Sequence, residues 1–283
     1  MTKIKCAFMC SAYRNTQSES LVKCINSCFT QNSGRTIIEV HVLLYVDGQV
    51  SKTLETIIEE LEHQYGMYLK VHRSDDNQGL AVGLNFLIDN YYLDYDYLLR
   101  IDTDDINLPN RVFMQISYLQ DNLDIDVLGG AIIETHHVNP NFSTKRFLKY
   151  PTRERILTTI AKRSPVAHPS VCFRSKIFSN PYYRYPISNF NEDIALWFLL
   201  IKGGVKFDNL QVPVIEFTID RVFFNRRSFN KAVLEFKIYS AGIISLGLPV
   251  HKLIYPVLRF IFRLMPQRLV AFIYRSKLRT TNK

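Results

Sequence analysis

The sequence of 283 residues predicts an α/β fold in which a mostly parallel sheet is flanked by helices. Short apolar runs rich in β-branched and aromatic residues alternate with longer stretches in which apolar residues recur at helical spacing. Four such runs separated by helices indicate right-handed βαβ crossovers. The composition, 47% hydrophobic and 22% charged, is that of a globular chain and excludes disordered and collagen-like classes.

Each element predicted in the first half rests on a local signal. The strand Glu39–Val46 is a continuous apolar run that ends at the turn pair Asp47 and Gly48. Pro109 stands near a helix N-terminus, where its missing N–H has no hydrogen bond to lose. The predicted strands are Lys3–Cys10, Glu39–Val46, Leu69–His72 and Tyr95–Ile101. The predicted helices are Ser18–Thr30, Ser51–Gln64, Gly79–Asn90 and Pro109–Gln120.

The second half is less regular. Its predicted strands are Val127–Glu134 and Pro169–Phe173, and its predicted helices are Thr152–Lys162 and Asn191–Lys202. The run Val205–Ile219 contains Pro213, so we expect two short strands joined by a bend. From Ser228 the pattern is helical and basic to the end.

The net charge of +9 is confined to the last fifth of the chain. Residues 231–283 hold ten Lys or Arg and one acid, Glu235, whereas residues 1–230 hold 25 of each sign. Lys252, Arg259 and Arg263 share one helical face, which is typical of a basic amphipathic helix in a membrane interface. A helical hairpin packed on the body with a solvated basic face is the alternative. Nucleic acid is not expected as a partner, because no recognisable binding module accompanies the charge.

The cysteines and the apolar runs indicate where the protein resides. Five cysteines, an odd number found mostly in apolar stretches, argue against a disulfide framework and for a reducing compartment. Met1–Cys10 lacks the long apolar region and cleavage site of a signal peptide. The longest uncharged apolar run, Ile238–Val250, is too short to span a bilayer. We therefore expect a cytoplasmic protein without a transmembrane helix.

Three carboxylates follow the fourth predicted strand. Asp102, Asp104 and Asp105 fall at a strand's carboxyl end, where open α/β sheets bind ligands. Their mutual repulsion destabilises the loop unless a cation or hydrogen bonds compensate. Hard divalent ions take oxygen ligands and keep substrate phosphates in their shell. The cluster therefore indicates a metal-bound diphosphate, with an acidic turn that caps the next helix as the alternative.

A second acidic pair, Glu192 and Asp193, opens the predicted helix Asn191–Lys202. Acids in the first helical turn are favoured by the helix dipole, so capping is one interpretation. The other is that one carboxylate is a general base that deprotonates an acceptor hydroxyl.

Five segments in order resemble the family 2 glycosyltransferases. They are the first-strand loop CSAY, VDG at Asp47, NQGLAVGLN at Asn77–Asn85, RIDTDDINLPNR at Arg100–Arg111, and NED at Asn191–Asp193. The stretch PTRERILTTIAKRSPVAHPSVCFR resembles the subgroup that makes bacterial O-antigens and amylovoran-type exopolysaccharides. The resemblance implies the GT-A fold and an inverting transferase that uses a nucleotide sugar and Mn²⁺ or Mg²⁺.

The resemblance also implies roles at matching positions. Asp104 would coordinate the metal that bridges the UDP diphosphate, Asp102 would support the ribose or the same metal, and Asp105 would fix the loop. Asp47 would contact the nucleotide base, and Tyr13 would lie near the uracil.

On the acceptor side, the same resemblance makes Asp193 the catalytic base, with Glu192 as its neighbour. His168 would line the acceptor site, although a purely structural histidine is the alternative. Arg226 and Arg227 are candidates for binding diphosphate, because a guanidinium pairs with phosphate bidentately, and a solvated surface pair is the alternative.

These observations predict a catalytic domain at 1–227 and a basic helical extension at 228–283. By the resemblance, residues 1 to about 110 would bind the UDP-sugar and 111–227 would bind the acceptor. The acceptor expected from the subgroup is a lipid-diphosphate-linked saccharide, undecaprenyl-linked GlcNAc or GalNAc, at the inner face of the bacterial membrane. One alternative is a sugar nucleotidyltransferase, but the first loop lacks the Gly-rich phosphate motif that this class needs. The other is a non-catalytic protein that binds polyanions or membrane surfaces.

Overall fold

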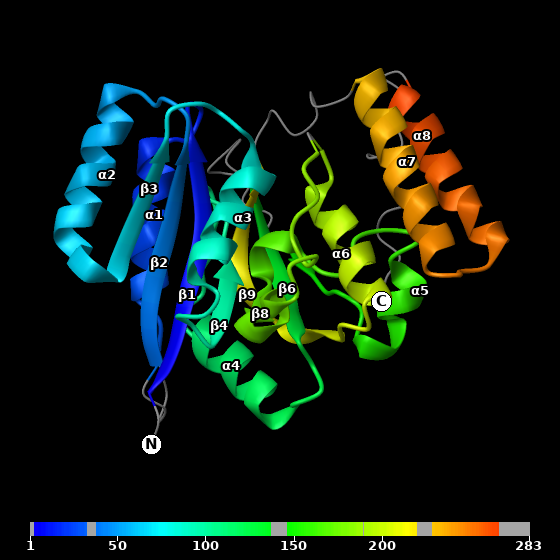
Figure 1. Ribbon diagram of the computed structural model, residues 1–283, viewed down its shortest axis with the longest axis horizontal. Coiled ribbons are helices and arrows are strands. Elements are labelled where there is room, and N and C mark those ends of the chain that lie inside the picture. Colours follow the sequence, from blue (N-terminus) through cyan, green and yellow to red (C-terminus); the bar gives the residue numbers. More distant parts are fainter. Residues whose placement is uncertain (1–2, 33–37, 137–145, 189, 220–227, 266–283) are drawn as a thin grey trace.

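A sheet of nine strands forms the centre of the molecule, and helices cover both of its faces (Figure 1). The computed structural model describes residues 3–32, 38–136, 146–188, 190–219 and 228–265. The strand order is β3-β2-β1-β4-β8-β6-β9-β5, and β7 pairs with β6. The strands are β1 Ile4–Tyr13, β2 Ile38–Asp47, β3 Leu69–Ser74, β4 Tyr97–Arg100, β5 Ile106–Asn107, β6 Val127–His136, β7 Arg146–Leu148, β8 Cys172–Arg174 and β9 Phe207–Ile219.

Parallel pairing joins the first four strands and also joins β6 to β9. The pairs β4–β8, β6–β8, β6–β7 and β5–β9 are antiparallel. The predicted α/β class is therefore confirmed. Each of these antiparallel pairs includes a strand that follows β4 in the chain. Because β5 directly follows the acidic loop and pairs with β9, the loop is tied to the far part of the sheet.

Both faces of the sheet are buried. In β1, Cys6, Phe8 and Cys10 pack in the core with α1, α2 and α4, whereas Ala7 and Met9 pack with α3 and α6 on the other face. A central strand with two covered faces needs apolar residues at every position, which explains the continuous apolar runs. The helices are α1 Ser18–Phe29, α2 Lys52–Tyr65, α3 Leu80–Tyr91, α4 Arg111–Asp121, α5 Ile156–Thr159, α6 Glu192–Lys202, α7 Phe229–Ser245 and α8 Ile254–Leu264.

Three predicted elements of the second half differ from the structure. The run containing Pro213 is one strand, β9, because bulges opposite Ala131 let the strand pass the proline without losing its pairing to β6. The helix expected at Thr152–Lys162 is a 3₁₀ turn followed by the four-residue α5. The strand expected from Pro169 begins at Cys172, after a 3₁₀ turn.

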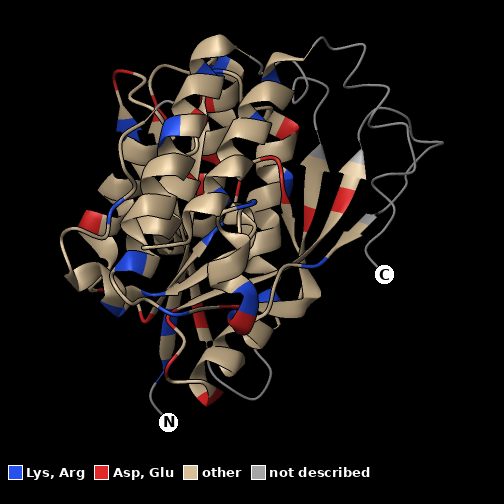
Figure 2. Cartoon of the chain, turned by 90° about the vertical axis from the view of Figure 1, so that its right-hand side faces the viewer, with Lys and Arg blue, Asp and Glu red and all other residues tan. Residues whose placement is uncertain are grey.

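Helices α7 and α8 form a hairpin at one side of the molecule (Figure 1). Tyr239 of α7 meets Phe198 of α6 edge to face, with ring centroids 5.9 Å apart, and Gly242 lies against the same Phe198 ring. In Figure 2, where this side faces the viewer, most of the ribbon of the hairpin is free of charged residues. No helix among the described residues combines the length and the apolar character that crossing a bilayer requires.

Candidate active site

The carboxyl ends of β1, β2 and β4 meet at one edge of the sheet. Tyr13 is paired in register with Asp47, and Met9 is paired with Arg100, the last residue before the acidic loop. The pairing brings Tyr13, Asp47 and Asp102, which are far apart in sequence, to the same edge. This is the edge at which parallel α/β sheets bind ligands.

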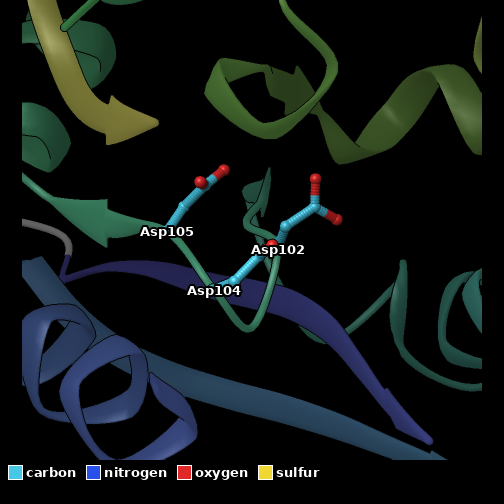
Figure 3. Close-up of side chains that lie close together, drawn as sticks. All are labelled: Asp102, Asp104 and Asp105. Carbon is cyan, nitrogen blue, oxygen red and sulfur yellow. The ribbon is translucent and has the colours of Figure 1, made fainter. Parts of the chain in front are cut away.

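The three acids of the loop after β4 gather their carboxylates in one place (Figure 3). One oxygen from each of Asp102, Asp104 and Asp105 lies within 4.8 Å of the others. Asp104 is exposed, Asp102 is partly buried and Asp105 is fully buried. The Asp105 Oδ1 atom accepts a hydrogen bond from the Thr218 N–H of β9 at 2.9 Å, which fixes the loop against the neighbouring strand.

The donor set of this cluster fits a hard divalent cation. Asp105 Oδ2 is buried without a hydrogen-bond partner, although a buried carboxylate oxygen ordinarily has one. Burial, and next the charges of Asp102 and Asp104, raise the pKa of Asp105 well above its ordinary value. A cation held by the three carboxylates would satisfy the unpaired oxygen and offset the repulsion.

Two buried arginines support the loop from beneath. The Arg100 guanidinium pairs with the Asp102 carboxylate and donates to the Met9 carbonyl at 3.3 Å. The Arg111 guanidinium donates to the Arg100 carbonyl at 2.8 Å and to Asn107 Oδ1 at 2.6 Å. Burial lowers the pKa of Arg111 to about 10, so its side chain still carries a positive charge at neutral pH.

Asp47 is buried and holds the loop that leads into α3. Its carboxylate accepts hydrogen bonds from the Gln78 N–H at 2.7 Å, the Gly79 N–H at 2.9 Å and Asn77 Nδ2 at 3.0 Å. Gly48 has φ of +78°, and a Cβ atom there would lie 2.7 Å from the Asn77 nitrogen, so the turn requires glycine. The structure thus gives Asp47 a positioning role, and contact with a base stays a prediction.

Tyr13 ends β1 with its side chain 39% exposed at the edge of the sheet. Its N–H donates to Thr16 Oγ1 at 2.9 Å, which fixes the turn after the strand. An exposed aromatic ring beside the Asp47 loop is compatible with stacking on a base.

The second acidic pair occupies the first turn of α6. Burial, and next the charge of Glu192, raise the pKa of Asp193 from its ordinary value to about 7. Burial also raises the pKa of Glu192. The Asp102 charge raises the pKa of both groups, so α6 and the acidic loop belong to one electrostatic site. A carboxylate with a pKa near 7 is matched to general-base work at neutral pH.

Asn191, which precedes this pair, has a left-handed backbone with φ of +58° and ψ of 33°. Among the described residues it is the one non-glycine with positive φ. Its Nδ2 atom is buried without a hydrogen-bond partner. Such a conformation costs about 1–3 kcal/mol and is found preferentially at functional sites.

His168 lies in the 3₁₀ turn before β8 and packs against Trp197 of α6. Its Nε2 atom is 2.9 Å from the Tyr185 hydroxyl, and its ring meets Trp197 edge to face. Asn85 fixes Tyr185 by two hydrogen bonds of 2.8 Å to its backbone. Burial, and next the charge of Arg100, lower the pKa of His168 to about 3, so its ring is neutral at physiological pH.

Sequence reasoning missed Arg100, Tyr185 and the conformation of Asn191. Arg100 had a detectable signal, since it is a charged residue in the otherwise apolar run YLLRI. Tyr185 lies in a segment without periodicity, and nothing in its sequence context marks it. The other two predicted site residues, Arg226 and Arg227, lie outside the described residues.

The helix-flanked sheet, with acids after β4 and at the start of α6, defines a transferase of the GT-A fold. The chain matches Glycosyl transferase family 2 over residues 10–180, more than half its length. It therefore belongs to this family and is a glycosyltransferase, as the sequence motifs predicted.

Two bacterial relatives match most of the chain. The Escherichia coli UDP-Gal:alpha-D-GlcNAc-diphosphoundecaprenol beta-1,3-galactosyltransferase is 28% identical over 249 residues, or 86% of this chain and 87% of the relative. The amylovoran biosynthesis glycosyltransferase AmsE of Erwinia amylovora is 26% identical over 271 residues, or 94% of this chain and 96% of the relative. The predicted resemblance to O-antigen and exopolysaccharide transferases is confirmed.

Solved structures confirm the fold. S. aureus TarS 1-349 in complex with UDP-GlcNAc superposes with a TM-score of 0.65 at 18% identity, covering 98% of this chain and 77% of that one. The mannosyltransferase PcManGT from Pyrobaculum calidifontis, in complex with GDP-Man and Mn²⁺, gives a TM-score of 0.64 at 11% identity, covering 97% and 76%.

Proposed function

We propose that this chain transfers a hexose or N-acetylhexosamine from a UDP-sugar to a lipid-diphosphate-linked saccharide during the synthesis of a bacterial surface polysaccharide. The observation that carries the proposal is one site that combines a carboxylate cluster suited to a divalent ion with Asp193, whose pKa is about 7. The polysaccharide context comes from the two bacterial relatives.

The donor half of the site is built on the sheet edge. Asp102 and Asp104, with Asp105 beneath them, would hold Mn²⁺ or Mg²⁺, which offsets charge on the departing diphosphate when bound. Tyr13 would stack near the uracil, and the loop that Asp47 holds would shape the nucleotide pocket. The TarS complex with UDP-GlcNAc and the PcManGT complex with Mn²⁺ support this assignment.

Asp193 would act as the general base. Its carboxylate would take the proton from the acceptor hydroxyl while that oxygen attacks C1 of the sugar and the bond from C1 to UDP breaks. Attack opposite the leaving group inverts the anomeric centre, so an α-linked donor would give a β-linked product. Glu192 would tune the pKa of Asp193, and the neutral His168 ring would line the acceptor site as a hydrogen-bonding group.

The acceptor assignment rests on the Escherichia coli relative, whose name gives a GlcNAc linked to diphosphoundecaprenol as its substrate. A lipid-linked substrate places the reaction at the inner face of the cytoplasmic membrane. We therefore propose that residues 1–227 form the catalytic domain and that the helices after residue 228 bring it to that surface.

Titration calorimetry with UDP tests the donor site. We expect the wild type and Asp193→Asn to bind UDP with Mn²⁺ or Mg²⁺ present, and Asp104→Asn or added EDTA to abolish binding. Turnover of a UDP-sugar should collapse in Asp193→Asn despite normal UDP binding, because this variant removes the base and leaves the donor site intact.

Two outcomes would contradict the proposal. UDP binding that persists unchanged in EDTA would remove the metal role from the acidic loop. Equal and modest losses of turnover in Asp104→Asn and Asp193→Asn would remove both assigned roles.

A further inference from the structure

Helix α8 turns a row of large apolar side chains away from the protein. The five residues are 39% to 53% exposed, although each is aliphatic. They recur at intervals of three, four, seven and ten, which is one face of a helix. We call this the α8 apolar face, and it consists of Ile254, Val257, Leu258, Ile261 and Leu264.

The charged side of the same helix points inward. Arg259 and Arg263 both pair with the carboxylate of Glu235 on α7, which is buried. Arg259 also donates to the Lys162 carbonyl at 3.1 Å, and the Arg263 guanidinium lies 4.6 Å from the centre of the Phe190 ring. A helix on the surface of a soluble domain ordinarily shows the reverse arrangement, with its apolar stripe against the core.

This orientation corrects the expectation for the tail. Two of the three residues predicted to form an outward basic face, Arg259 and Arg263, are partly buried and paired with the buried Glu235 carboxylate. The hairpin is packed on the catalytic body, as in the alternative, but the surface it exposes is apolar rather than basic.

The charge balance of the hairpin and of the sequence after it indicates what covers the α8 apolar face. Glu235 is the one acid between residues 228 and 265, and it is buried, so this hairpin exposes no carboxylate. Lys237 on α7 is exposed, and so is Lys162, whose ammonium lies 5.3 Å from the Tyr255 ring centre of the hairpin. Residues 266–283 add five basic residues and no acid.

An apolar face on a hairpin that exposes a lysine and no carboxylate matches an anionic lipid surface. A second copy of the chain is a poorer match, because a twofold contact would bring these cations together without carboxylates from the hairpin to offset them. We propose that α8 lies in the interface of an anionic bilayer, with the α8 apolar face among the acyl chains and the cations at the level of the headgroups.

The proposed location of α8 in the bilayer would also fix where Asp193 lies relative to the membrane. This part of the inference rests on the proposed function, in which Asp193 is the base. Asp193 is in the first turn of α6, and α6 packs on α7 through Phe198 and Tyr239. The proposed membrane helix is therefore linked to the helix of the base through α7, and Arg263 also contacts Phe190, which shortly precedes that helix. The packing of α6, α7 and α8 would then fix the distance of Asp193 from the membrane surface. A substrate whose lipid stays in the bilayer would have to present its acceptor hydroxyl at that distance.

Co-sedimentation of the full chain with vesicles tests the surface. The vesicles contain phosphatidylcholine with about one third phosphatidylglycerol, and pure phosphatidylcholine vesicles serve as the uncharged comparison. The test variant is the double substitution Leu258→Gln and Leu264→Gln. The matched control is Leu93→Gln with Leu123→Gln, since these leucines are 82% and 74% exposed and lie outside the hairpin.

We expect the wild type and the control to bind the anionic vesicles and the α8 variant to bind at least about tenfold more weakly. Binding of all three to pure phosphatidylcholine should be weaker than to the anionic vesicles. Circular dichroism and UDP calorimetry of the α8 variant should match the wild type, which shows that the fold and donor site are intact. If neither the wild type nor the two variants bound UDP, the proposed function would be contradicted. The vesicle result would still decide whether α8 binds the membrane.

Three results would overturn the inference. The first is equal vesicle binding by the α8 variant and the wild type. The second is a wild-type dimer in light scattering that the α8 substitutions dissociate, because a second copy would then cover the face. The third is vesicle binding that disappears when residues 266–283 are deleted but survives the α8 substitutions.

Discussion

Glu192 and Asp193 lie next to each other in the first turn of α6, and the charge of Glu192 adds to burial in raising the pKa of Asp193 to about 7. A base works only when it is deprotonated. We therefore expect kcat/KM to fall by about tenfold per pH unit as the pH drops below 7, and to level off above it. Initial rates over pH 5 to 9 with saturating metal check this.

Replacing the base should nearly abolish turnover. Asp193→Asn should reduce kcat by about 10²- to 10⁴-fold.

The variant Glu192→Gln tests which of the two carboxylates is the general base. Removing the charge of Glu192 lowers the pKa of Asp193, so the acid limb of the kcat/KM profile should move to lower pH while activity persists. If Glu192 were the base, the variant would be inactive at every pH.

Asp193 should also reduce the stability of the fold at neutral pH. Its pKa is about 7 in the folded protein against an ordinary 3.8, so the folded state disfavours the ionised form. Stability from this group is therefore lost as pH rises from about 4 to about 7 and is constant above that range. Asp193→Asn should have a higher melting temperature than the wild type at pH 8, and the gain should shrink toward pH 4. A variant that melts lower at pH 8 would show that the ionised carboxylate stabilises the fold.

Asp102 should matter for stability as well as for metal binding. Asp102→Asn weakens the ion pair of the buried Arg100, and we expect a loss of about 1–3 kcal/mol in the free energy of unfolding. Asp104→Asn, at an exposed position, should cost less than about 1 kcal/mol. Urea unfolding without metal measures both. Equal losses would mean that the Arg100 pair contributes nothing specific.

The turn at Gly48 offers a matched pair of substitutions. Gly48 and Gly66 both have positive φ, but a Cβ atom at Gly48 would meet the Asn77 backbone, whereas nothing lies within 4 Å at Gly66. Gly66→Ala should lose about 1 kcal/mol through backbone strain. Gly48→Ala should lose more and also weaken UDP binding, because Asn77 belongs to the loop that Asp47 holds. If both variants lost the same free energy of unfolding and Gly48→Ala bound UDP as tightly as the wild type, the loop would not be part of the donor site.

Glu235 should hold the α7–α8 hairpin together. Burial raises the pKa of Glu235, but the charges of Arg259 and Arg263 outweigh that effect and lower it below its ordinary value. The ion pairs of Glu235 with the two arginines therefore stabilise the fold fully above the ordinary glutamate pKa of 4.5. This contribution is lost as the pH falls through the lowered pKa of the folded state. Glu235→Gln should lower the free energy of unfolding at pH 7 by about 1.5–3 kcal/mol, measured as unfolding at a lower urea concentration. The difference from the wild type should narrow at pH 3, and a constant difference would contradict the ion-pair explanation.

The parts of the site that lie in short continuous segments were predictable from the sequence. Asp102, Asp104 and Asp105 follow a buried strand, and Asp193 opens a helix, so local pattern and family resemblance were enough to find them. The partners of these residues come from distant segments. Thr218 reaches Asp105 across 113 positions, and Asn85 fixes Tyr185 across 100. Hydrophobic periodicity carries no information on such pairs.

The orientation of α8 shows the same limit in a different way. The helical spacing of Arg259 and Arg263 predicted a shared face correctly, but spacing does not say whether a face points inward or outward. The inward direction depends on Glu235, 24 and 28 positions earlier, and on the way α7 packs against α6. Likewise, the bulges that let β9 pass Pro213 depend on its pairing with β6.

The bond between Asp47 and Gln78 uses the main-chain N–H of residue 78 and not its side chain. The loop is therefore anchored by a group that every amino acid except proline supplies. Position 78 is free to change its side chain without releasing the anchor, whereas position 47 is not. If this loop shapes the nucleotide pocket as proposed, a saturation library at residue 78 would vary the chemistry of that pocket on an unchanged scaffold.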